Sequence, residues 1–176
     1  MIKRVSIISI VLLVATVVAW YEVSFSSYKS QLKEVISFSK VKYEPIEKKL
    51  YPLAVIAEEQ QGIRAFAMRS AFFEYGYKEN RSGNTAWHLN NTLWLAASYL
   101  NFSDREVFYL WCAFLPYEKG RGADLAALHY FNKDIELLTL REYAGLVAVA
   151  RGPSVFKPGS QKYKDRVDLI LSKFRH

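Results

Sequence analysis

The feature that most constrains this chain is an uninterrupted apolar run at its N-terminus. After "MIKR", the segment "VSIISIVLLVATVVAWY" carries no charged residue from Val5 to Tyr21, and it ends in two aromatic residues. A helix of about 20 mostly apolar residues is long enough to span a bilayer. Basic residues at one end and aromatic residues at the other are typical of the membrane interfaces. The run therefore predicts a transmembrane anchor over residues 1–23.

The alternative is a cleavable signal peptide. Such a peptide has an apolar region of about 7–15 residues followed by small residues at the cleavage site. The sequence "VVAWYEV" at the end of the run lacks such a site, which favours an uncleaved anchor. Lys3 and Arg4 precede the run, and basic flanks stay in the cytoplasm. We therefore expect a single-pass protein of the cytoplasmic (inner) membrane, with its main domain extracytoplasmic or periplasmic.

The rest of the chain is sufficient for one ordinary domain with a hydrophobic core. The net charge of +7 predicts an anionic surface or ligand nearby, such as acidic lipid or phosphate. The sequence has no zinc-finger spacing, no Walker loop and no aromatic-basic RNA signature, so nucleic acid is not expected as a partner. Because Cys112 is the single cysteine, stability must come from packing and not from an intramolecular disulfide.

Helical spacing of apolar residues dominates the chain after the anchor. Residues 24–52 read as a polar juxtamembrane connector with one short amphipathic helix, and Pro45 and Pro52 interrupt the pattern. From Leu53 onward apolar residues recur every three or four positions, and turn signals fall at "GYKENRSGN", "PYEKGRG" and "RGPSVFKPGS". We therefore expect an all-α domain of six to eight short helices over residues 53–176.

One helix near the C-terminus is marked at both ends. Thr139 and Glu142 have the spacing of a capping box, in which a hydroxyl and a carboxylate each accept an unpaired backbone N–H. Gly152 and Pro153 follow the apolar-periodic residues, and this pair ends a helix. The segment therefore predicts a buried helix between Thr139 and Gly152.

Four motifs follow one another in this half of the chain. A glycine-rich turn at residues 120–122 precedes "AALHYFNK" (126–133), "LTLREYAGL" (138–146) and "PSVFKP" (153–158), and a closing "KYKDRVDLILSKF" places an arginine before an apolar run. In this order and spacing the motifs resemble the peptidoglycan glycosyltransferase (transglycosylase) domain of class A penicillin-binding proteins and monofunctional transglycosylases, glycosyltransferase family 51. The resemblance covers roughly residues 53–174, in a divergent and shortened form.

The resemblance implies a mainly helical, lysozyme-like, two-lobed domain behind one N-terminal transmembrane helix. Such domains join sugars that arrive as lipid-linked pyrophosphates at the outer face of the cytoplasmic membrane. The reaction needs a base for the incoming hydroxyl and positive charge or metal for the departing pyrophosphate. The implied partners are membrane lipid, lipid-linked peptidoglycan precursor and other cell-wall synthesis proteins. A divalent cation, Mg or Mn, is implied only if the domain is active, and no metal-ligand motif is present.

The first family motif, E-D-x-x-F-x-x-H-x-G, is similar to "AVIAEEQQGI". Glu59 falls on the catalytic base and Glu58 is an additional neighbour, whereas Gln60 replaces the aspartate and the histidine is missing. Two adjacent glutamates after an apolar run predict a raised carboxyl pKa, which suits a base. The alternative is a pair of solvated carboxylates at a helix end.

The second motif, G-G-S-T-x-x-Q-Q-L, is similar to "SGNTAWHLNN". Gly83 and Thr85 match it, and His88 stands near the glutamine pair. His88 would either donate a hydrogen bond to a phosphate oxygen or be a satisfied, partly buried side chain.

The third motif, R-K-x-x-E, has no counterpart, since "AASYLNF" stands where it belongs. Its loss removes the second catalytic glutamate and its basic partners, which stabilise the leaving group. Lys119, Arg121 and Lys133 remain as candidates to hold phosphate.

These departures favour a non-catalytic or weakened module that binds lipid-linked precursor or cell-wall synthases. The first alternative is an active minimal glycosyltransferase that uses Glu59 as general base, with Glu58 or another carboxylate replacing the lost partner. The second alternative is an unrelated membrane-tethered helical interaction protein whose exposed aromatic residues bind partners.

Overall fold

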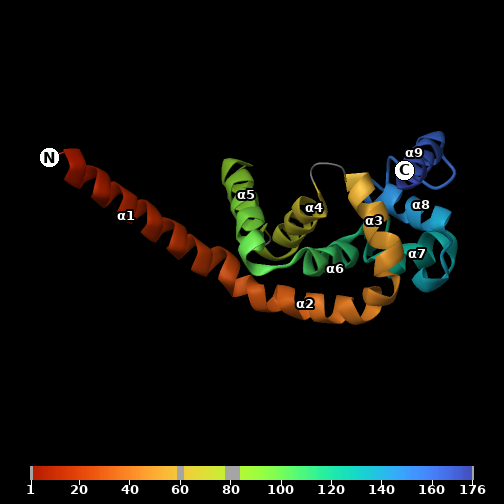
Figure 1. Cartoon of the computed structure of the whole chain (residues 1–176), viewed down its shortest axis with the longest axis horizontal. Coiled ribbons are helices and arrows are strands. Elements are labelled where there is room, and N and C mark those ends of the chain that lie inside the picture. The colour runs from red at the N-terminus through yellow and green to blue at the C-terminus, as the bar shows by residue number, and fades with distance from the viewer. Residues whose placement is uncertain (1, 59–61, 78–83, 176) are drawn as a thin grey trace.

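The computed structural model describes residues 2–58, 62–77 and 84–175, and the side chains within 7–58, 62–76 and 86–175. Helices account for most of the described chain (Figure 1), which confirms the predicted all-α class. The lysozyme-like arrangement of two lobes stays a prediction. The α-helices are α1 (Ile2–Trp20), α2 (Ser27–Tyr43), α3 (Glu47–Glu58), α4 (Gly62–Ala71), α5 (Asn84–Asn101), α6 (Asp104–Phe114), α7 (Ala123–Phe131), α8 (Leu140–Ala150) and α9 (Gln161–Phe174).

Short elements connect these helices. Two are π-helical, η1 (Tyr21–Ser26) and η4 (Phe72–Tyr77), and two are 3₁₀-helical, η2 (Glu44–Ile46) and η5 (Ile135–Leu137). The two-residue strands β1 (Pro116–Tyr117) and β2 (Gly120–Arg121) pair antiparallel, with Pro116 opposite Arg121. The glycine-rich turn predicted from the sequence is therefore the end of a very short hairpin.

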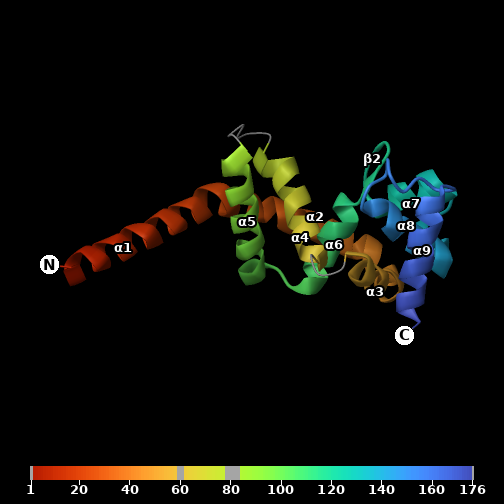
Figure 2. The same cartoon turned by 90° about the horizontal axis from the view of Figure 1, so that it is seen from above.

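Helix α1 extends away from the rest of the molecule (Figures 1 and 2). Its apolar side chains, such as Ile7, Leu13 and Val17, are exposed. By length and composition, the helix that starts here is the one in the described chain that could cross a membrane. It continues through η1 into α2 without a break, so an anchor would be joined directly to the body.

The junction between α1 and the body is held by aromatic residues. The indole Nε1 of Trp20 donates to Oδ1 of Asn90 over 2.6 Å, and the hydroxyl of Tyr21 donates to Oδ1 of Asn101 over 3.0 Å. Phe25 is fully buried and meets the ring of Trp94 edge-on at 5.4 Å. Both hydrogen bonds end on α5, so α5 lies at the end of the body that is joined to α1.

In the body, the helices stack outward from α2. Helix α6 packs along α2 and supports α4, and α4 in turn packs against α5. At the other end, α3 packs against α8 and α9, and α7 to α9 form the end farthest from α1 (Figure 2). Helix α3 passes through Pro52, which was expected to interrupt the helical pattern. Leu50, Leu53 and Ala54 bury one face of this helix, and that burial offsets the backbone hydrogen bond that proline removes.

The predicted C-terminal helix is confirmed as α8. Thr139 caps it, and the capping box with Glu142 is complete in both directions. Every residue from Tyr143 to Ala150 is buried. A side chain at Gly145 would place its Cβ 2.1 Å from the hydroxyl oxygen of Tyr163 on α9, so glycine is what lets α9 approach this closely.

Candidate functional site

A buried carboxylate ends α3. Glu58 is 8% exposed, and its Oε1 accepts a hydrogen bond from the indole Nε1 of Trp111 over 3.2 Å. Trp111 lies on α6 and is itself fully buried. Glu59, which the resemblance assigns as the base, lies outside the described residues, so its predicted role is untested.

Three arginines surround this end of α3. Nη2 of Arg166 on α9 donates to the backbone oxygen of Ala57 over 2.7 Å, and Nη1 of Arg151, just past α8, lies 3.5 Å from the same oxygen. The last carbonyls of a helix have no partner within it, so these guanidinium groups satisfy the end of α3. Arg69 of α4 adds a third positive charge that acts on Glu58. We call Arg69, Arg151 and Arg166 the arginine cluster.

Opposing effects act on the pKa of Glu58. Burial raises it, whereas the hydrogen bond from Trp111 and the charges of the arginine cluster lower it. Burial is the largest effect, so the pKa is raised. A carboxyl whose pKa is raised towards neutrality is suited to proton transfer. Glu58 is therefore not a solvated carboxylate, although its catalytic role stays a prediction.

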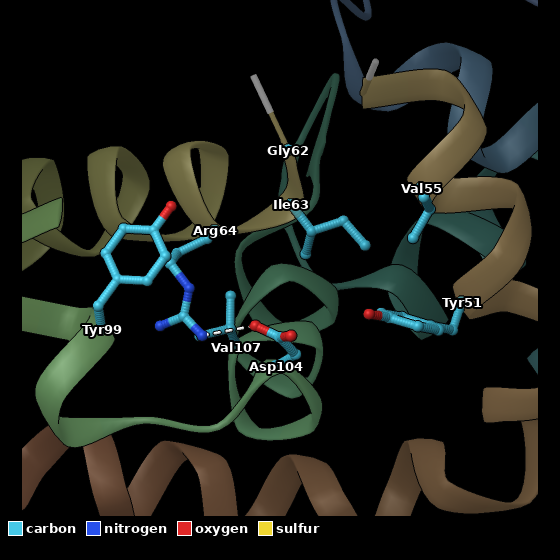
Figure 3. A pocket seen from close by; sticks show the side chains of 8 residues that line it. All are labelled: Tyr51, Val55, Gly62, Ile63, Arg64, Tyr99, Asp104 and Val107. Carbon is cyan, nitrogen blue, oxygen red and sulfur yellow. Dashed lines mark hydrogen bonds and ion pairs between the residues drawn. The ribbon is translucent and has the colours of Figure 1, made fainter. Parts of the chain in front are cut away.

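A pocket of about 210 Å³ lies one helical turn from Glu58. Tyr51, Val55 and Glu58 follow one another at spacings of four and three on α3, and Val107 and Trp111 are four apart on α6, so each set shares a helix face. Glu58 and Trp111 continue these two faces, although neither of them lines the pocket itself. Figure 3 shows the lining residues, which are Tyr51, Val55, Gly62, Ile63, Arg64, Tyr99, Asp104 and Val107.

The polar side of this pocket is an ion pair. Arg64 Nη2 donates to Asp104 Oδ1 over 2.6 Å (Figure 3), and the guanidinium also donates to the backbone oxygens of Ser98 at 2.8 Å and Phe102 at 3.0 Å. The same group lies 4.5 Å from the centre of the Tyr99 ring. Arg64 therefore fixes the connection between α5 and α6, where the third family motif is missing. It also pairs with Asp104, the carboxylate that lines this pocket.

The residues predicted from the second motif lie on or before α5. Gly83 is outside the described residues, and for Thr85 only the backbone at the start of α5 is described. His88 is exposed and meets the Trp87 ring edge-on at 4.8 Å. In Figure 1, α5 lies on the side of α1 and α7 to α9 lie at the opposite end. Lys133 follows α7 and bonds Glu142 of α8, so it belongs to the end of the molecule opposite to His88.

Two of the three predicted phosphate-binding residues are used within the fold. Arg121 pairs with Glu74 at 3.1 Å. The Nζ of Lys133 donates to Oε1 of Glu142 over 2.6 Å and so supports the capping box of α8. Lys119 is exposed in the turn between β1 and β2. The arginine cluster was missed as a site, although the closing motif does place Arg166 before an apolar run.

The charges described around Glu58 do not favour the divalent cation that the resemblance implies for an active domain. Among the described residues, the carboxylate of Glu58 is accompanied by the three guanidinium groups of the arginine cluster, which would repel a cation. Across the described ranges, no group of three or more histidine, cysteine, aspartate or glutamate side chains gathers to hold a metal ion. The same charges favour an anion.

Comparison with known proteins gives one family for the second half of the chain. Residues 92–175 match the family model described as Transglycosylase. This match confirms the resemblance for residues 92–175, from within α5 to the end of α9. Trp111, Arg151 and Arg166 lie inside the match, whereas Glu58 and Arg69 precede it. Neither the curated proteins nor the solved structures gave a match to the chain.

Proposed function

We propose that this chain is a membrane-anchored, extracytoplasmic transglycosylase-like module that binds lipid-linked peptidoglycan precursor, with its polymerase activity lost or weakened. The observation that carries the proposal is the convergence of the arginine cluster on the end of α3. Two of its members, Arg151 and Arg166, belong to the matched segment. The family match supports a role linked to peptidoglycan synthesis.

The chemistry of the cluster suits a pyrophosphate. Arginine presents a planar set of N–H donors that binds phosphate oxygens in pairs. The neighbouring pocket has apolar and aromatic walls, from Tyr51, Val55 and Tyr99, with few polar groups, which is the usual form of a small-molecule site. A sugar joined to the pyrophosphate would occupy this pocket while the arginines hold the charge.

The same geometry argues against efficient polymerisation. Sugar transfer needs an available base and a second group to stabilise the leaving pyrophosphate. Glu58 is already bonded to Trp111, and Asp104 is engaged by Arg64. Binding would persist without a complete catalytic set.

The membrane part of the proposal rests on α1. Its exposed apolar surface and its continuous path into α2 support a single span. Lys3 and Arg4 would keep the N-terminus cytoplasmic, so the arginine cluster would meet the precursor on the outer side. Other cell-wall synthesis proteins are the second partner class that we propose.

A retention assay tests the proposal. Detergent-solubilised full-length chain would be titrated with fluorescent lipid-linked disaccharide-pentapeptide, beside Arg151→Gln and a matched control, Arg141→Gln. Arg141 is exposed on α8 and pairs with Asp168 at 2.9 Å, outside the cluster. Loss of one charged hydrogen bond to phosphate, about 1.5–3 kcal/mol, predicts at least tenfold weaker binding for Arg151→Gln. Equal affinities for all three proteins, or no binding at all, would contradict the proposal.

A second function is favoured by the raised pKa of Glu58. In this alternative the chain is an active minimal glycosyltransferase with Glu59 as general base and Glu58 as the replacement carboxylate. Burial keeps a fraction of Glu58 protonated at a higher pH than an exposed glutamate, so the residue would serve as an acid. Polymer formation by the wild-type chain distinguishes this alternative from a module that only binds.

A further inference from the structure

A second groove lies where the end of α2 meets α7 and η5. Its volume is about 350 Å³, and it is lined by Lys42, Asp124, Leu125, Leu128, Asp134, Ile135 and Glu136. Because η5 contacts η2, the groove adjoins the start of α3, whereas the arginine cluster lies at its end. The twelve residues of α3 separate the two sites by about 18 Å.

Three of the residues that line the groove are apolar. Leu125 and Leu128 lie three residues apart on α7 and are 47% and 54% exposed, whereas Ile135 is buried. Single exposed leucines are common on protein surfaces, but neighbouring ones that line a concavity mark an interaction site.

The rim of the groove is acidic although the chain is basic. Asp124 is paired with Lys42 and also accepts a hydrogen bond from the Tyr43 hydroxyl at 2.6 Å. Asp134 and Glu136 are exposed and form no ion pair with another described residue. Three carboxylates therefore face one lysine, on a chain whose net charge is +7. This charge disfavours an anionic lipid surface and attracts a cationic partner.

We propose that this groove docks a cationic amphipathic helix of a partner protein. In such helix-in-groove recognition, apolar residues at i, i+3, i+4 and i+7 enter the groove. The volume accommodates one or two aliphatic side chains, and flanking lysines or arginines would face Asp134 and Glu136. The inference does not depend on the ligand of the arginine cluster.

A peptide titration tests this inference. The probe is a fluorescent leucine–lysine helix with leucines at i, i+3, i+4 and i+7, added to the full-length chain in uncharged detergent, and its counterpart carries glutamate for every lysine. Leu128→Lys removes an apolar contact and adds a repelling charge, and we expect it to weaken binding of the cationic peptide at least tenfold. Glu136→Lys should weaken it severalfold at low salt, and less at high salt.

Two matched variants control for general effects. Leu169→Lys changes a leucine of similar exposure, 46%, on α9, and Glu34→Lys changes an exposed glutamate on α2. Both should bind the cationic peptide as the wild type does. Equal binding of the acidic peptide, or equal losses in the controls, would overturn the proposal. A third outcome would also overturn the proposal: Leu128→Lys leaves peptide affinity unchanged but abolishes self-association or vesicle binding. The occupant of the groove would then be a second copy of the chain or lipid.

Discussion

Helices α8 and α5 belong to the same all-α body but differ in how they are held. Every residue from Tyr143 to Ala150 in α8 is buried, and a complete capping box starts the helix. In α5, Trp94, Ala97 and Ser98 are buried, whereas Leu89 and Leu100 are 60% and 86% exposed. Helix α8 lies wholly inside the transglycosylase match, and α5 enters it only at residue 92. Helix α8 is therefore held by burial from Tyr143 to its end, whereas α5 is buried along one face only and crosses the start of the matched residues.

The largest effect should come from the core of α8. Leu146→Ala removes a fully buried side chain and leaves a cavity, which costs about 2–5 kcal/mol of unfolding free energy. Leu89→Ala on α5 truncates an exposed leucine and should change stability by no more than about 0.5 kcal/mol. Denaturant unfolding of both variants measures the contrast. Equal losses would show that α5 is covered as fully as α8.

The contact between α8 and α9 should be nearly as sensitive. Gly145→Ala places a methyl group 2.1 Å from the Tyr163 hydroxyl oxygen. Overpacking of this kind costs about 1–3 kcal/mol, measured as a lower Tm. Adding Tyr163→Ala to Gly145→Ala removes the clash, so the double variant should lose less than the sum of the two single losses. Strict additivity would mean that the two residues do not meet.

The capping box of α8 gives a smaller effect that depends on pH. The hydrogen bonds from Lys133 and Thr139 lower the pKa of Glu142 to about 2. A lowered folded-state pKa adds stability above the unfolded value of 4.5, and this stability is lost as pH falls towards 2. Glu142→Gln should therefore cost about 0.5–1 kcal/mol at pH 7, and the difference should vanish near pH 2. A difference that does not change with pH would exclude the ion pair as its cause.

The stability contributed by Glu58 should depend on pH in the opposite direction to that of Glu142. Burial raises its pKa, so ionisation costs stability as pH rises above the unfolded value of 4.5. Gln at this position still accepts the Trp111 hydrogen bond. We expect Glu58→Gln to match or exceed wild-type stability at pH 7 and to lose that advantage below pH 4.5, as measured by Tm across this range. A variant that is less stable at pH 7 would show that the charges of the arginine cluster outweigh burial.

The sequence predicted local features more fully than distant ones. The capping box of Thr139 and Glu142 depends on residues three apart, so it could be predicted and was confirmed. The site at Glu58 joins α3, α4, α6, α8 and α9, and no local pattern indicates that Arg69 and Arg151 act on one carboxylate. The family motifs predicted that His88 and Lys133 belong to one substrate site. Where these two residues lie in space, however, depends on how the helices pack, which the motifs do not encode. Lys133 instead supports the α8 cap.

The most direct test of the central claim is polymer formation measured beside precursor binding. Full-length chain in detergent would receive lipid-linked disaccharide-pentapeptide, with and without divalent metal, as wild type, Glu58→Gln, Glu59→Gln and Arg151→Gln. A module that only binds predicts no glycan polymer from any of them, and retention of precursor that weakens at least tenfold in Arg151→Gln alone. Polymer made by the wild type and lost in Glu59→Gln or Glu58→Gln would contradict this account and establish a minimal glycosyltransferase.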